Sequence, residues 1–180
     1  DVVEQYDPDF IYTDGTVQGP FTGNGTGTGV KADAMPRVIA DFYNRALERR
    51  GQMDTFSIVK FRKKTNGTVN TEEHGVPANI NTNQPWIAEA PVGDWFYAPR
   101  FTYDSGMMIR YVIEAIARDG NAALCISLLP DGSLDEGSLK MLREVGVWMR
   151  RNGEAVYGSR AWTIPGEGEI VPGKLKMLPG

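Results

Sequence analysis

The residue with the clearest chemical potential in this sequence is Asp14. It follows the aromatic and β-branched run Phe10–Thr13, which predicts a short buried strand, and it precedes a long loop rich in glycine and threonine. A carboxylate at a strand tip beside a long loop is well placed to act as a nucleophile or as a general acid or base. The pair Asp14-Gly15 is also typical of a plain turn after a strand, and spacing alone leaves both interpretations open.

The loop after Asp14 contains a second suggestive pattern, the glycine-rich segment Gly23–Gly29. Glycine backbones at the start of a helix can approach a phosphate closely, so a phosphate-binding loop is one interpretation. Two features argue against it. The segment lacks a Gly-Lys-Ser or Gly-Lys-Thr ending, and the charge of Asp14 would repel phosphate there. We therefore expect this loop to form a flexible rim over a site.

Strand and helix patterns alternate along the chain. Short apolar or β-branched runs predict strands at Phe10–Thr13, Thr55–Phe61, Trp86–Val92, Ala122–Leu129 and Ala155–Trp162. Apolar residues at helical spacing predict three helices: from Asp33 to Gly51, from Ser105 to Gly120, and from Ser133 or Asp135 to a left-handed stop at Asn152-Gly153. Their predicted buried faces are, in order, Met35, Val38, Ile39, Phe42 and Ala46; Ile109, Val112, Ile113 and Ile116; and Leu139, Leu142, Val145 and Met149.

This alternation predicts an α/β fold whose parallel strands are joined by right-handed crossovers. Five strands and three helices do not close a barrel of eight strands, which typically takes about 250 residues. A barrel built from this chain would therefore be partial. An open, doubly wound sheet is the alternative, and it accounts for the length without a missing piece.

Composition narrows the classes of partner. The 180 residues include 19 basic and 23 acidic side chains, for a net charge of −4, and no basic tract that would neutralise a run of phosphates. No apolar run approaches the roughly 20 residues that cross a bilayer. We therefore predict neither nucleic acid nor membrane as a partner. The single cysteine, Cys125, excludes an internal disulfide, and its apolar neighbours predict a packing role.

Two long stretches resemble glycoside hydrolase family 29, the α-L-fucosidases. Gly153–Arg160, preceded by Leu142–Trp148, resembles the end of that family's catalytic barrel. Near the other end of the chain, Tyr12–Gly15 resembles the strand end that carries the family's nucleophile. The resemblance extends from Tyr6 to Trp162 and is weakest between residues 60 and 100.

A third stretch, Gly120–Gly132, is similar to a family segment but departs from it. Cys125, Ser127 and Leu128 replace the Asn, Gly and Pro that the family has in and after this strand. The resemblance as a whole implies that residues 1–162 are the C-terminal half of a (β/α)8-type, TIM-like barrel. Residues 163–180 would be an irregular tail or the start of a following domain. The N-terminal half of the same barrel would then be a required partner.

The resemblance also implies an activity. An exo-acting glycosidase of this kind hydrolyses terminal α-L-fucosides with retention of configuration, through a covalent glycosyl-enzyme, and without a metal or an organic cofactor. The implied substrate is a fucosylated oligosaccharide or glycan, and closely related α-L-galactosides remain open. The alternative is a catalytically inactive carbohydrate-binding relative of the same fold.

For the catalytic residues, the resemblance implies Asp14 as the nucleophile and Glu72 as the acid/base. Retaining glycosidases hold two such carboxyl groups roughly 5 to 5.5 Å apart. Glu72 is assigned because Gly67–Glu72 resembles the family's acid-bearing loop. Glu73 and Glu89 compete with it, since a catalytic acid needs a raised pKa and sequence does not show burial. A solvated acidic pair at residues 72 and 73 is the interpretation without catalysis.

Three further residues are candidates for binding the sugar. Arg62 follows a predicted strand, and the resemblance suggests that it donates hydrogen bonds to the substrate; the alternative is a surface charge. Trp95 and Tyr97 lie in a segment that resembles an aromatic landmark of the family. An aromatic face can pack against the apolar side of a sugar, although buried aromatic residues more often belong to a core.

Overall fold

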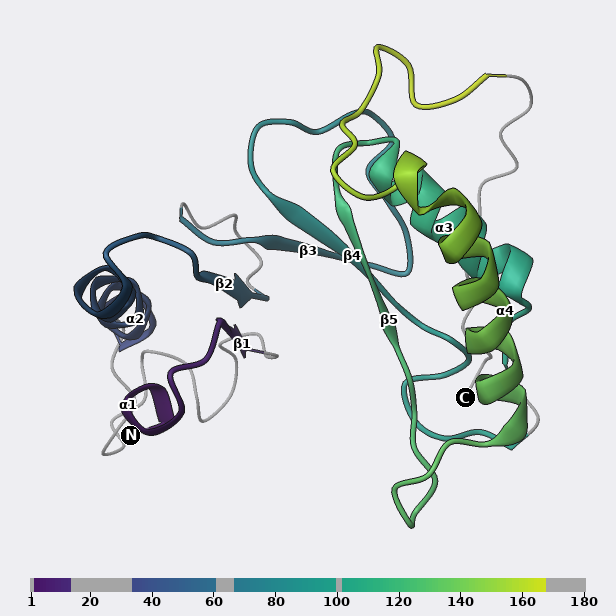
Figure 1. Ribbon diagram of the computed structural model, residues 1–180, viewed down its shortest axis with the longest axis horizontal. Helices are drawn as coiled ribbons and strands as arrows, with labels where there is room; N and C mark the ends of the chain where they lie inside the picture. The colour runs from purple at the N-terminus through teal and green to yellow at the C-terminus, as the bar shows by residue number, and fades with distance from the viewer. Residues whose placement is uncertain (1, 14–33, 61–66, 100–101, 168–180) are drawn as a thin grey trace. The chain divides into compact units, whose positions relative to one another are not determined.

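The computed structural model describes residues 2–13, 34–60, 67–99 and 102–167. The chain divides into two compact units, Asp1–Asn70 and Thr71–Gly180. The predicted helix start at Asp33 and the loop Gly15–Gly29 lie outside the described residues. Each unit is built around its own small sheet, and each sheet contains a parallel pair of strands (Figure 1).

The first unit packs one long helix against two strands. Its elements are α1 (Val2–Tyr6), β1 (Phe10–Thr13), α2 (Ala34–Arg50) and β2 (Phe56–Val59), and β1 pairs with β2 in parallel. Its buried apolar residues are Ile39, Phe42, Ala46, Ile58 and Val59. Gly51 ends α2, as the sequence predicts, and its φ of 70° lies in the left-handed region.

The strand at Phe10–Thr13 is confirmed, but the prediction that it is buried is wrong. Phe10 is 48% exposed and Tyr12 is 40% exposed, whereas Ile11 and Thr13 are half-buried. Alternate side chains of a strand point to opposite faces, so a sheet that is well covered on one face only exposes every second residue. Phe10 is partly protected because its ring stacks on Phe56, with centroids 5.1 Å apart.

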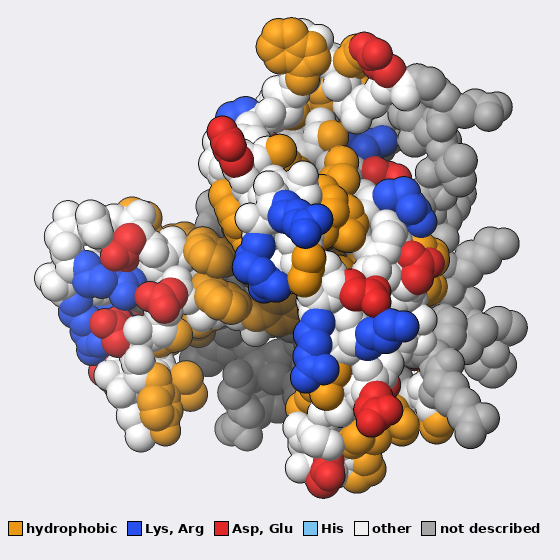
Figure 2. Space-filling view, turned by 45° about the vertical axis from the view of Figure 1, so that its right-hand side comes forward, with side chains coloured by type: hydrophobic (Ala, Val, Ile, Leu, Met, Phe, Trp, Pro, Cys, Tyr) orange, Lys and Arg blue, Asp and Glu red, His pale blue; other side chains and the backbone are white. Residues whose placement is uncertain are grey.

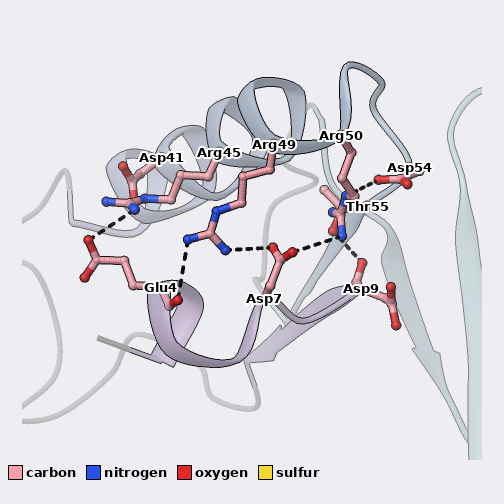
Figure 3. A network of polar contacts seen from close by, with 9 residues as sticks. All are labelled: Glu4, Asp7, Asp9, Asp41, Arg45, Arg49, Arg50, Asp54 and Thr55. Carbon is pink, nitrogen blue, oxygen red and sulfur yellow. Dashed lines mark hydrogen bonds and ion pairs between the residues drawn. The ribbon is translucent and has the colours of Figure 1, made fainter.

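A network of ion pairs fastens α1 and the following turn to α2 (Figure 3). Arg45 contacts Glu4 at 3.1 Å and Asp41 at 2.8 Å. Arg49 contacts Asp7 at 3.3 Å. Arg50 continues the network to Asp7 and Asp54, and the Thr55 hydroxyl donates to the Asp9 carbonyl. Single exposed ion pairs contribute little, but several that share partners fix the geometry of this turn.

The second unit contains the larger core. The strands β3 (Asn70–Glu73), β4 (Trp86–Pro91) and β5 (Asn121–Cys125) lie in the order β3-β4-β5, and α3 (Ser105–Ile116) and α4 (Glu136–Asn152) cover one face of this sheet (Figure 1). The pairing of β4 with β5 is parallel, as predicted. The core consists of Trp86, Ala88, Ala90, Val92, Met108, Tyr111, Ala115, Met141 and Val145. The polar strand β3 was not predicted, because Asn-Thr-Glu-Glu has no apolar alternation.

The end of the described chain differs from the prediction. A strand was expected at Ala155–Trp162, but Gly153–Ala155 forms the 3-10 helix η2 and turns follow it. Gly153 has a φ of −57°, so the predicted left-handed stop at Asn152-Gly153 is also wrong. The physical reason is that η2 continues the right-handed winding of α4, and the left-handed glycine comes later, at Gly158.

Local capping decides where the two helices of the second unit begin. Asp135, rather than Ser133, caps α4 and accepts hydrogen bonds from the backbone N–H groups of Gly137 and Ser138. For α3, the cap is Asp104 rather than the predicted Ser105, because the Asp104 carboxylate accepts from the Met107 N–H at 2.9 Å. A carboxylate satisfies the orphan N–H groups of the first turn and also suits the positive end of the helix dipole.

The buried face of α3 also differs from the prediction. Met108, Tyr111 and Ala115 are buried, whereas Ile113 is exposed. The helix is apolar around most of its circumference, so periodicity alone does not select the inner face. Its outer apolar face, with Ile113 and Ile116, lines a cavity of about 350 Å³ together with residues from α4 and the segment after it.

The other two helices follow their predicted faces more closely. In α2, Ile39, Phe42 and Ala46 are buried, and Val38 is exposed. In α4, the fully buried residues are Ser138, Met141 and Val145, while Leu142 and Met149 are partly buried against the core.

No described helix is long and apolar enough to span a bilayer. On the face shown in Figure 2, basic and acidic side chains are interspersed.

Gly120 is required for packing, and replacing it tests the core of the second unit. A Cβ atom built on Gly120 would lie 2.2 Å from Cζ2 of Trp86, the largest of the fully buried side chains described. The Trp86 ring is held in place because its Nε1–H donates to the Asn81 carbonyl at 3.1 Å. We expect Gly120→Ala to lower the free energy of unfolding by about 1–3 kcal/mol, measured by chemical denaturation.

Gly146→Ala is the matched control for this prediction. Gly146 lies inside α4, and the nearest atom that its added Cβ would meet is Nη1 of Arg150, at 3.7 Å. Alanine favours a helix interior over glycine by about 1 kcal/mol, so the control should be neutral or stabilising. Wild-type stability in Gly120→Ala would contradict the packing described around Trp86.

Candidate active site

Two of the predicted site residues, Asp14 and Arg62, lie outside the described residues. The structure therefore does not test their roles, which remain predictions. What it does describe is the strand that leads to Asp14, since β1 ends at Thr13. The described part of the candidate site lies in the second unit, at the ends of β3 and β4.

The three glutamates that compete for the acid/base role differ in exposure. Glu72, in β3, is half-buried, and its neighbour Glu73 is exposed. Glu89, in β4, is only 3% exposed. Because Ala88 and Ala90 pack against the core under α3 and α4, strand alternation directs Glu89 to the opposite face of the sheet. In a barrel, that opposite face is the interior, which leads to the active site at the carboxyl ends of the strands.

Tyr111 of α3 lies in the core of the second unit and is affected by the charges of two of these acidic residues. Its side chain is 2% exposed, and its hydroxyl has no hydrogen-bond partner among the described residues. Burial raises the pKa of the Tyr111 phenol far above its ordinary range, and the charges of Glu89, Cys125 and Glu72 raise it further. The structure therefore brings Glu72 and Glu89 into the electrostatic surroundings of one buried hydroxyl.

A histidine and a tryptophan form a close pair beyond the ends of β3 and β4. The Trp95 indole Nε1–H donates to Nε2 of His74 at 3.0 Å. The two rings meet edge to face, with centroids 5.1 Å apart and an interplanar angle of 74°. His74 directly follows β3 and Trp95 lies shortly after β4, so this bond joins the two strand ends.

The backbone at both partners is also fixed. The His74 N–H donates to the Glu89 carbonyl at 2.9 Å, and the Trp95 N–H donates to Asp94 Oδ1 at 2.7 Å. His74 has a φ of 57°, which is the left-handed region and costs a residue with a side chain of order 1–3 kcal/mol. Such strain persists where the surroundings enforce it, and it often marks a functional position.

The aromatic residues predicted to bind the sugar take different positions. Trp95 is half-buried and paired with His74, whereas Tyr97 is 37% exposed. Neither belongs to the core cluster of the second unit, so the interpretation as core residues is not supported by the packing. Both follow β4, on the side where its carboxyl end lies.

Sequence reasoning had not assigned His74 or Tyr111 to the site. The available signal for His74 was its position directly after Glu72-Glu73. For Tyr111, the signal was a phenol on a helix whose neighbours are apolar, which places a polar atom in a core. Among the described residues, no group of three or more His, Cys, Asp or Glu side chains is arranged to hold a metal ion.

A sequence profile of the α-L-fucosidase family matches residues 1–154. This chain belongs to the α-L-fucosidase family. The match includes β1, Asp14 and the three candidate acids, and it ends just after α4.

Solved α-L-fucosidase structures share the fold of this chain. An α-fucosidase of Thermotoga maritima in complex with a mechanism-based inhibitor aligns with a TM-score of 0.70 and 18% identity, covering 91% of this chain and 34% of that one. Isoenzyme 1 of Paenibacillus thiaminolyticus aligns with a TM-score of 0.65 and 22% identity, covering 87% of this chain and 38% of that one. A trapped covalent intermediate of a Bacteroides thetaiotaomicron enzyme aligns with a TM-score of 0.65 and 16% identity, covering 89% and 39%.

The chain thus spans little more than a third of the length of these α-L-fucosidases. A search of curated protein sequences gave no significant match. The family assignment rests on the profile match, and the structural alignments show a shared fold.

Proposed function

We propose that this chain supplies the nucleophile and the acid/base of a retaining α-L-fucosidase that removes terminal α-L-fucose from glycans. The observation that carries the proposal is the family match over residues 1–154, which contains both proposed carboxylates. A covalent intermediate has been trapped in the Bacteroides enzyme, which supports a double-displacement mechanism for its relatives.

In the proposed reaction, the Asp14 carboxylate attacks the anomeric carbon while Glu72 protonates the departing glycosidic oxygen. The fucosyl-enzyme ester is then hydrolysed by water, from which Glu72, now a carboxylate, removes a proton. Each of these two steps inverts the anomeric carbon, so the released sugar has the same anomeric configuration as the substrate. Arg62, Trp95 and Tyr97 are proposed to hold the sugar, and no metal or organic cofactor takes part.

We assign the acid/base role to Glu72 because it combines partial burial with access. Glu89 is almost fully buried within β4, and Glu73 is exposed. A general acid must reach the leaving oxygen and must also be shielded enough to hold its proton near neutral pH. The half-buried position of Glu72 near the end of β3 supports this assignment, because it is neither enclosed like Glu89 nor exposed like Glu73.

The remaining parts of the barrel are proposed to come from an N-terminal half that pairs with this chain. The fold shared with a third of the length of known α-L-fucosidases supports this view. Residues 1–162 would belong to the barrel, and residues 163–180 would lead out of it.

The experiment is hydrolysis of 4-nitrophenyl α-L-fucoside by the full-length protein, with the first-formed sugar followed by proton NMR. We expect α-L-fucose before mutarotation, which demonstrates retention. The matching α-L-galactoside, run in parallel, measures the preference at C6. Measurable fucose binding without turnover would instead identify the inactive carbohydrate-binding relative.

A further inference from the structure

We infer that His74 is a positioning residue for sugar binding: its Nε2 atom holds the Trp95 indole in the orientation that receives the fucosyl ring. The inference rests on the proposed function, because it assigns Trp95 to the sugar pocket. It adds a residue that the sequence patterns did not assign, and it makes substrate binding depend on the protonation state of one imidazole.

The geometry of the pair supports this role. An indole nitrogen is a donor only, so the 3.0 Å contact between Trp95 Nε1 and His74 Nε2 requires Nε2 to be the acceptor. The proton of the neutral imidazole then resides on Nδ1. The edge-to-face packing of the rings, at 74°, restricts rotation of the indole further.

The backbone around the pair explains why His74 can act as a fixed point. Its N–H is bonded to the Glu89 carbonyl in β4, and its left-handed φ of 57° is held by that connection. Trp95 is half-buried and lies in the connection between β4 and α3, outside the strands themselves. The hydrogen bond therefore transfers the rigidity of the strands to an aromatic ring in a loop.

Protonation of His74 would remove this restraint. The imidazolium has two N–H donors and no acceptor, so it cannot receive the Trp95 Nε1–H. Among the described residues, the titratable groups on the elements beside the pair include Glu72 and Glu73 on β3, Glu89 on β4, and Asp94, Tyr97 and Tyr103 in the connection that carries Trp95.

The test uses two replacements of His74 in the full-length enzyme. His74→Phe keeps a flat ring but has no acceptor, and we expect KM for an aryl α-L-fucoside to rise roughly five-fold at pH 8, with a smaller change in kcat. His74→Gln retains an acceptor oxygen that does not titrate, and it should restore most of the wild-type KM. Between pH 8 and pH 5, KM should rise in the wild type more than in His74→Gln.

Comparing KM with kcat separates this effect from the ionisation of the catalytic acid, which both enzymes share. Trp95→Phe supplies the second control, because it removes the indole N–H and keeps a ring. If the two residues act together, His74→Phe should have little further effect in the Trp95→Phe background. An unchanged KM in His74→Phe, or full additivity of the two substitutions, would overturn the inference.

A measurement without substrate tests the pairing of His74 with Trp95 separately from the proposed fucosidase activity. In protein labelled with ¹⁵N-tryptophan, the Trp95 indole resonance, assigned with Trp95→Phe, should shift between pH 8 and pH 5 in the wild type and not in His74→Gln. An enzyme without fucosidase activity but with this shift would refute the function and retain the pair. A fucosidase whose indole resonance ignores His74 would refute the inference alone.

Discussion

Asp14→Ala in the full-length protein is expected to reduce kcat for aryl α-L-fucosides by roughly 10⁴-fold or more, because the variant lacks the carboxylate that we propose as the nucleophile. The protein should remain folded, since the buried apolar residues of the first unit, such as Phe42 and Ile58, are unchanged in this variant. Far-ultraviolet circular dichroism and the unfolding midpoint would check this. The kinetic measurement is release of 4-nitrophenol at saturating substrate.

Azide makes the Asp14 prediction specific to a nucleophile. In Asp14→Gly, the small anion can occupy the space of the carboxylate and attack the anomeric carbon directly, while Glu72 still protonates the leaving group. The product of this single displacement is β-L-fucosyl azide, with inverted configuration. Rescue of this kind would establish that Asp14 attacks the sugar. Activity close to that of the wild type in Asp14→Ala would instead support the alternative that Asp14-Gly15 only forms a turn after the strand.

Glu72→Gln is expected to lower kcat by roughly 10²- to 10⁴-fold for substrates with a poor leaving group, because proton donation to the glycosidic oxygen is lost. The loss should be much smaller for 2,4-dinitrophenyl α-L-fucoside, whose leaving group departs without a proton. The basic limb of the pH profile of kcat/KM, which reports ionisation of the acid, should also disappear.

Neighbouring glutamates provide the controls for Glu72. Glu73→Gln changes an exposed side chain next to it in β3, and we expect no comparable dependence on the leaving group. Glu89→Gln tests the buried competitor in β4. In Glu72→Ala, azide should intercept the fucosyl-enzyme and give α-L-fucosyl azide, the opposite anomer to that from Asp14→Gly. If a variant of Glu73 or Glu89 showed the leaving-group dependence and the α-L-fucosyl azide product instead, the acid/base role would belong to that residue.

Several features of the fold could be predicted because they depend on residues close together in the sequence. A strand at Phe10–Thr13 and the end of a helix at Gly51 are features of this kind, and both are confirmed. The cap at Asp135 follows from the same local chemistry, since a carboxylate can reach N–H groups two and three residues ahead. Membership of the α-L-fucosidase family was likewise expected from the sequence and is confirmed.

The sequence by itself therefore determined the family, most of the elements and the identity of the candidate carboxylates. Only the tertiary structure decided which apolar face of α3 is buried, that residues 153–155 form a helical turn, and that His74 meets Trp95. Backbone hydrogen bonding and capping act over a few residues, so local patterns report them. Burial of Glu89 and the pairing of side chains 21 positions apart depend on how strands and helices pack, and no local pattern contains that information.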